Sequence, residues 1–298
     1  MGTASGEARY SWTYPPGVFG EDGPLVAVGV LPHANEPLGS AFASTLPGYR
    51  GFGRVVLVGP IDPPPHHFPL PTDPVGYAAG GYLQPLEGQA EFAHCAEPVT
   101  PAQHRAAGLR ARLAELRPDA FVLLHNDVGA IAPYVYANRA WPAVTRRLQA
   151  AFPAAPALGA AWTTVLDERT YAYFPPARVG VGGTECAGRY IEQTLGIPTL
   201  TVELPMFEWG ADLRRLAVAR AMGEWIARGA SHGGDAPRLV REVAAAIGER
   251  DVPMVPAAVN AEVVWAALAG VFETLWLAVG PMLALRPTEV LGGRDPRT

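Results

Sequence analysis

One motif combines two residue types that often bind a metal. The apolar segment 25–31 (LVAVGVL) runs into PHANEP, which places His33 three residues before Glu36. Residues three apart lie on the same face of a helical turn. An imidazole beside a carboxylate is a common zinc pair, so His33 and Glu36 are candidate metal ligands.

Two further residues follow apolar segments in the same way. His125 comes directly after the run 120–124 (AFVLL), and Glu203 lies near the end of the run 199–204 (TLTVEL). A carboxylate is almost never fully buried unless it has a partner, so Glu203 within an apolar strand needs a reason. A catalytic zinc takes three protein ligands and leaves one position open, and a carboxylate base completes such a site.

The elements around these residues predict an α/β fold. Apolar runs rich in Val and Leu are typical of strands buried on both faces, and they alternate here with helical spacing. We expect a mixed, mostly parallel sheet flanked by helices, with ligands at the carboxyl ends of its strands. The expected strands are 25–31, 55–58, 120–124 and 199–204, and the expected helices include 102–116, 140–151, 187–195, 213–228, 237–247 and 257–283.

Composition limits the function classes. The 298 residues have a net charge of -5 and 17% charged residues, which argues against a disordered chain. Without a Lys/Arg run, a nucleic-acid partner is not expected. The two cysteines, Cys95 and Cys186, make no disulfide framework or metal motif. The first residues show no signal peptide, so a cytoplasmic location is expected.

The C-terminal part carries a long apolar segment. Residues 263–285 contain one charge, Glu273, and are long enough to span a bilayer. A membrane span is not favoured, because a carboxylate near the centre costs about 2.5–3.5 kcal/mol. We expect a helix that is buried or that forms a homo-oligomer interface. The predicted organisation is a catalytic domain, 1–230, followed by a helical extension, 231–298.

The order of the candidate residues resembles the zinc carboxypeptidase family, including its aspartoacylase/succinylglutamate desuccinylase branch. The matching stretches are GVLPHANEPLGS, AFVLLHNDVGA and GIPTLTVELP. The resemblance implies a mixed, twisted, eight-stranded sheet flanked by helices. It also implies that His33, Glu36 and His125 bind Zn²⁺ and that Glu203 is the general base.

The chain departs from that family where the substrate is bound. The family normally carries an Asn-Arg pair, often as D-L-N-R, between its HxxE motif and the later histidine. Here the only Asn-Arg dipeptide, Asn138-Arg139, comes after His125. Arg139 or Arg178 could supply the carboxylate anchor instead. The resemblance also implies Tyr171 or Tyr173 as the family's mobile tyrosine and Glu185 as its specificity-pocket acid. The arginine that polarises the carbonyl could be Arg50, Arg54, Arg105 or Arg110.

These features predict a zinc-dependent hydrolase that cleaves an amide bond in a small molecule or a short peptide. Because the usual carboxylate anchor is missing, we expect a narrow enzyme acting on a small amide such as an N-acyl amino acid. A carboxypeptidase that releases C-terminal residues, an acyl transferase and an inactive metal-binding or assembly protein are the alternatives. An intact Glu203 argues against the last of these.

Overall fold

A computed structural model of the chain describes residues 14–33, 36–62, 88–127, 133–137, 139, 141–151, 187–208 and 253–279. These residues contain six strands in one sheet, in the order β1-β3-β2-β4-β6-β5. Their bounds are β1 Val18–Phe19, β2 Leu25–Gly29, β3 Arg54–Val58, β4 Ala120–Asp127, β5 Tyr134–Ala137 and β6 Thr199–Pro205.

The sheet is mixed, with a parallel centre. Strands β3, β2, β4 and β6 run parallel to one another, and β1 and β5 pair antiparallel at the two edges. The predicted mixed, mostly parallel sheet is therefore confirmed. The eight strands that the family resemblance implies stay a prediction, because six lie within the described part of the chain.

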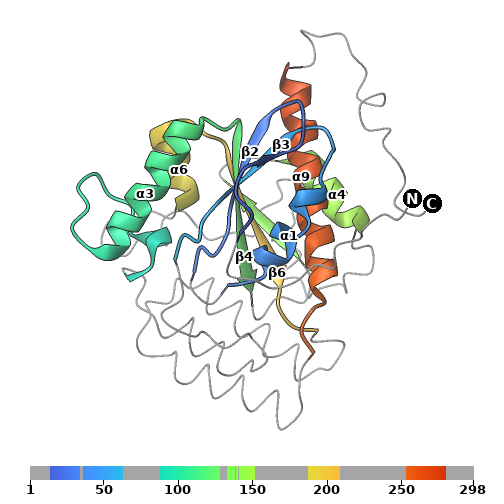
Figure 1. Ribbon diagram of the computed structural model, residues 1–298, viewed down its shortest axis with the longest axis horizontal. Coiled ribbons are helices and arrows are strands. Elements are labelled where there is room, and N and C mark those ends of the chain that lie inside the picture. The colour runs from blue at the N-terminus through green and yellow to red at the C-terminus, as the bar shows by residue number, and fades with distance from the viewer. Residues whose placement is uncertain are drawn as a thin grey trace.

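Helices cover both faces of the sheet (Figure 1). Helices α3 and α6 lie on one side, and α1, α4 and α9 lie on the other. Their bounds are α1 Gly39–Ala43, α3 Pro101–Leu116, α4 Pro142–Ala151, α6 Ala187–Leu195 and α9 Ala257–Val279, and two short 3-10 turns, η1 Leu46–Gly48 and η3 Ala90–Phe92, lie between them.

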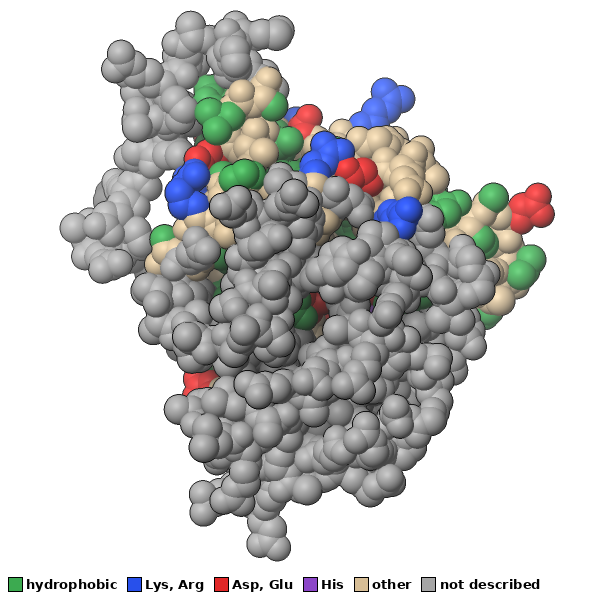
Figure 2. All heavy atoms as spheres, turned by 180° about the vertical axis from the view of Figure 1, so that it is seen from behind, with side chains coloured by type: hydrophobic (Ala, Val, Ile, Leu, Met, Phe, Trp, Pro, Cys, Tyr) green, Lys and Arg blue, Asp and Glu red, His purple; other side chains and the backbone are tan. Residues whose placement is uncertain are grey.

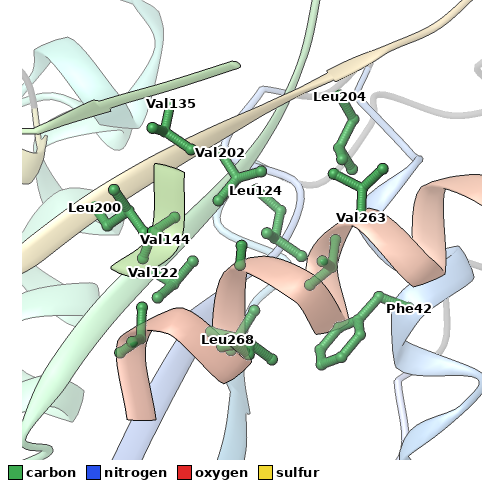
Figure 3. Packing of buried hydrophobic residues seen from close by; sticks show 14 of the residues in the cluster. Phe42, Val122, Leu124, Val135, Val144, Leu200, Val202, Leu204, Val263 and Leu268 are labelled. Atoms are coloured by element: carbon green, nitrogen blue, oxygen red, sulfur yellow. The ribbon is translucent and has the colours of Figure 1, made fainter. Parts of the chain in front are cut away.

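The larger core lies between the sheet and α9. Figure 3 shows Val122 and Leu124 of β4 and Val202 of β6 beside Val263 and Leu268 of α9. These side chains are completely buried, and burial of each stabilises the fold by about 1.5–3 kcal/mol. Alternate strand residues point to the same face, which explains why even-numbered positions of β4 and β6 build this core.

The odd-numbered positions of the same strands face α3 and α6. Phe121 and Leu123 of β4 pack there with Leu113 of α3 and Ile191 of α6. The alternation continues to the strand ends, so His125 belongs to this second face. The candidate site is therefore expected on the α3 and α6 side of the sheet.

Local residues explain where helix α3 begins and ends. The Thr100 side chain accepts a hydrogen bond from Gln103 N, and the Gln103 side chain accepts one from Thr100 N in return, which is a capping box. Pro101 fits the first turn because its missing N–H would have no partner there. The helix ends at Arg117 in the left-handed conformation.

Helix α9 is long and apolar enough, by length and composition, to cross a membrane. Its residues Val263, Ala267, Leu268 and Val271 are nevertheless fully buried against the sheet and its neighbouring helices. Glu273 pairs with Arg146 and Arg147 of α4. The expected burial is therefore observed for these four apolar residues, whereas Leu277 is exposed and residues 280–285 lie outside the described part of the chain. The two-domain organisation and the homo-oligomer stay predictions.

Charges of both signs are mixed on the described surface that Figure 2 shows, where Arg and Asp/Glu side chains are interspersed. The expected helices 213–228 and 237–247 lie outside the described residues, as does Cys186.

Candidate metal centre

The parallel strands bring the predicted residues to one edge of the sheet. The chain leaves the carboxyl ends of β2, β4 and β6 at the same edge, where α/β proteins place their sites. His125 and Glu203 are register partners on β4 and β6. Neighbours in register point to the same face of a sheet, so both side chains lie on the α3 and α6 side.

A tight turn follows β2 and carries the other two residues. Glu36 N donates to His33 O at 3.1 Å, which closes the turn predicted from their spacing. The turn is joined to β4 by Asn126, whose Oδ1 accepts from Leu38 N at 2.9 Å. Leu31, just before the turn, has a φ of 51°, a conformation that L-residues other than Gly rarely adopt. Because Asn126 accepts the hydrogen bond from Leu38 N, it links the turn after β2 to the end of β4.

His33, Glu36 and His125 form one compact cluster. One ligand atom from each lies within 4.8 Å of the others, and His125 Nδ1 is 3.0 Å from Glu36 Oε2. Around tetrahedral zinc with bonds of about 2.1 Å, ligand atoms are about 3.4 Å apart. The cluster therefore has the scale of a three-ligand zinc site.

Two buried atoms of this cluster are suited to bind a cation. Within the described part of the chain, His33 Nδ1 and Glu36 Oε2 are among the buried side-chain atoms that make no hydrogen bond. Glu36 Oε2 contacts His125 Nδ1 at 3.0 Å, but a buried carboxylate oxygen that accepts no hydrogen bond is still costly. A metal ion would satisfy both atoms at once, so the residues present fit the Zn²⁺ that the sequence implies.

Glu91 of η3 is a fourth member of the site that the sequence did not predict. Its Oε2 lies 2.7 Å from His33 Nε2 and 3.6 Å from His125 Nε2. Its side chain is almost fully buried. The carboxylate thus faces the Nε2 side of both rings, whereas Glu36 faces His125 on the Nδ1 side.

The electrostatics of the metal-free site are those of a buried ion pair. Burial alone would lower the pKa of His33, but the carboxylates of Glu36 and Glu91 outweigh it and raise the pKa to about 9. Burial alone would raise the pKa of Glu91, but His125 and His33 outweigh it and lower the pKa to about 2. The carboxylates therefore favour positive charge at this position.

The predicted base, Glu203, lies beside the cluster. It is 7% exposed on β6 and has His125 of β4 and Tyr134 of β5 as register partners. Glu203 therefore lies one strand away from His125, on the same face of the sheet. This position is consistent with the role the sequence suggests.

The structure does not bring Arg139 to the cluster. Arg139 donates to Glu192 of α6, and it follows β5, whose last residue, Ala137, is the partner of Leu200 near the start of β6. Glu203 lies at the other end of β6. The other candidate substrate-binding residues, Tyr173, Arg178 and Glu185, lie outside the described residues.

The four arginines considered for the scissile carbonyl have other partners. Arg50 and Arg54 donate to backbone carbonyls of Tyr49 and Gly23. Arg105 pairs with Asp62. Arg110 contacts His94 Nδ1 and donates to the Cys95 carbonyl.

With the site defined, comparison with known proteins gives structural neighbours only. No protein-family model and no curated protein matches the chain. A metallo-carboxypeptidase from Burkholderia cenocepacia is 15% identical, with a TM-score of 0.43, over 88% of this chain and 60% of that one. A succinylglutamate desuccinylase/aspartoacylase from Rhodobacter sphaeroides is 18% identical, with a TM-score of 0.35, over 71% and 57%.

A murein-tripeptide amidase from Escherichia coli O157 is a further neighbour, 14% identical with a TM-score of 0.30, over 72% of this chain and 94% of that one. Both branches of the family that the sequence resembles are thus represented. The chain spans about three fifths of the length of the first two structures. All three TM-scores are below 0.5, so the functional argument below rests on the site.

Proposed function

We propose that the protein is a zinc-dependent hydrolase that cleaves an amide bond of a small substrate. His33, Glu36 and His125 would hold the metal, and Glu203 would be the general base. The observation that carries the proposal is the buried His-Glu-His cluster at the carboxyl edge of the sheet, with a ligand atom from each residue within 4.8 Å.

The hydrogen bonding supports Nδ1 as the ligand atom of His33. Its Nε2 lies 2.7 Å from Glu91, and its Nδ1 makes no hydrogen bond to any residue that the structure describes. A ligating histidine usually donates its second ring N–H to a carboxylate or carbonyl. The pairing of Nε2 with Glu91 leaves the Nδ1 lone pair for the metal.

The chemistry divides between the metal and Glu203. Zinc bound here would supply a Lewis acid that polarises the scissile carbonyl and makes water a better nucleophile. Glu203 accepts the proton of the attacking water and then delivers it to the leaving amine. The buried setting keeps bulk water from competing for these groups.

Five arginines in the described part of the chain support a small amide as substrate rather than a broad range of peptide C-termini. Arg50, Arg54, Arg105, Arg110 and Arg139 each have partners away from the cluster. A free α-carboxylate usually needs a charge-assisted anchor, and each such hydrogen bond contributes about 1.5–3 kcal/mol. We infer a preference for N-acyl amino acids or similar small amides.

The test is hydrolysis of a panel of N-acyl amino acids and dipeptides by the purified protein. We expect turnover that is lost on chelation, restored by zinc, and reduced about 10²–10⁴-fold in Glu203→Gln with zinc still bound. The exposed Glu208→Gln on the same strand end is the control. Near-normal turnover in Glu203→Gln would remove Glu203 from this role, and efficient trimming of unrelated peptides would favour a carboxypeptidase.

A further inference from the structure

An ion pair between Asp62 and Arg105 lies next to the turn that carries Glu91. Asp62, which follows β3, is 5% exposed and accepts a hydrogen bond from Arg105 Nε of α3 at 2.5 Å. Its other carboxylate oxygen accepts from Ala90 N at 2.8 Å. Ala90 is the first residue of η3 and directly precedes Glu91, so Asp62 is bonded to the backbone that carries Glu91.

The same pair is fixed at two more points. Arg105 Nη2 donates to Gly88 O at 3.1 Å, just before η3. Asp62 N donates to Leu31 O at 2.8 Å, and Leu31 is two residues before His33. Asp62 therefore connects the strand end leading to His33, the turn carrying Glu91, and helix α3.

The turn η3 meets His33 with two side chains. Glu91 Oε2 lies at 2.7 Å from His33 Nε2, and Phe92 stacks on the imidazole with ring centroids 5.7 Å apart. A small displacement of η3 would therefore change both the hydrogen bond and the orientation of the ring. Short turns such as η3 have few internal bonds of their own, so external bonds determine their position.

We propose that Asp62, held by Arg105, is a positioning residue of the metal centre: it places η3 so that Glu91 holds the Nε2 side of His33 and turns Nδ1 toward the metal. The inference rests on the proposed function for its metal and on the geometry alone for the link from Asp62 through Glu91 to His33. Neither Asp62 nor Arg105 is one of the proposed metal ligands.

The link itself is tested in the metal-free protein by NMR of ¹⁵N-labelled histidine. The His33 Nε2–H proton, hydrogen-bonded to Glu91, should give a low-field signal that is absent in Glu91→Gln and lost or shifted in Asp62→Asn. Arg105→Gln is the second variant: its site on a helix is one-third exposed, so it should fold even if the buried Asp62→Asn does not. Glu115→Gln, an exposed carboxylate on the same helix, should leave the signal unchanged.

Zinc affinity, measured by competition with a chromogenic chelator, provides the second readout. We expect about tenfold weaker binding in Asp62→Asn or Arg105→Gln, the low end of the effect of outer-shell partners. The effect should largely vanish when either change is added to Glu91→Gln, because contacts that act through a shared residue are not additive.

The outcomes separate the inference from the proposed function. An unchanged His33 signal in both variants, or zinc losses that add fully to that of Glu91→Gln, would overturn the positioning role while leaving zinc binding intact. A wild-type protein that binds no zinc but shows the expected change in the His33 signal would overturn the proposed function and leave the link from Asp62 to His33 standing.

Discussion

A single carboxylate oxygen, Glu91 Oε2, lies 2.7 Å from His33 Nε2 and 3.6 Å from His125 Nε2. It therefore faces the two imidazoles on their Nε2 side, and His125 Nδ1 faces Glu36 instead. This arrangement assigns the two kinds of carboxylate different tasks. In the proposed site, Glu36 binds the metal and Glu91 orients the rings that bind it.

The first prediction concerns this orienting role. Glu91→Gln should still bind zinc but about 10–100-fold more weakly, as expected for the loss of an outer-shell carboxylate. The measurement is a zinc titration against a chelator of known affinity. Glu97→Gln, an exposed carboxylate a few residues away, is the matched control. Equal affinity in the two variants would show that Glu91 does not support the metal.

Much of the fold can be predicted from the sequence because its central strands are buried on both faces. Four apolar runs mark β2, β3, β4 and β6, and the predicted helix 187–195 coincides with α6. The edge strands β1 and β5 were missed, because two and four residues are too short for a periodic signal. The five-residue α1 was missed for the same reason.

The same rule decides which residues of the candidate site can be predicted: those that follow or end an apolar run. His33, Glu36, His125 and Glu203 follow or end apolar runs, so their positions can be predicted from the sequence. Glu91 lies in the segment 59–97, which is rich in Pro and Gly and has no periodicity. A glutamate between apolar neighbours in AEFA hints at burial, but only the tertiary fold brings it to His33.

Substitutions at two glycines test whether α9 packs against α4 in solution. A Cβ on Gly270 would lie 2.5 Å from Val144 Cα and 2.6 Å from Val144 N in α4, so Gly270→Ala should destabilise the protein by about 1–3 kcal/mol despite the better helix propensity of Ala. A Cβ on Gly108 of α3 would meet nothing within 4 Å, so Gly108→Ala should stabilise it by about 0.5–1 kcal/mol.

Urea denaturation of both variants measures these changes. Opposite signs are expected because α9 packs closely on α4 at Gly270, whereas Gly108 faces open space. If Gly270→Ala were as stable as Gly108→Ala, α9 would not pack against α4 in solution as it does here, and the C-terminal helix would have to lie elsewhere.

His94 makes stability depend on pH. Burial, followed by the Arg110 guanidinium, lowers the pKa of His94 from 6.5 to about 4, and Glu91 opposes this only in part. Between these values the unfolded chain binds a proton that the folded protein does not, so stability falls as the pH falls from 6.5 toward 4. The shift corresponds to about 3 kcal/mol at most.

The contribution of His94 is isolated by comparison with His94→Asn, whose side-chain oxygen can still accept from Arg110 but does not titrate. The free energy of unfolding is measured in urea at several pH values between 7 and 4. We expect the wild type to lose more stability than the variant over this range. A constant difference between the two proteins would contradict the assigned shift.

Zinc content, measured by mass spectrometry of the metal after extensive dialysis, tests the central claim most directly. The wild type and the control His104→Ala, which changes an exposed histidine of α3, should each retain about one zinc per chain, because three ligands form one site. His33→Ala and His125→Ala should each lose it while remaining folded. Full zinc content in both of these variants would contradict the account.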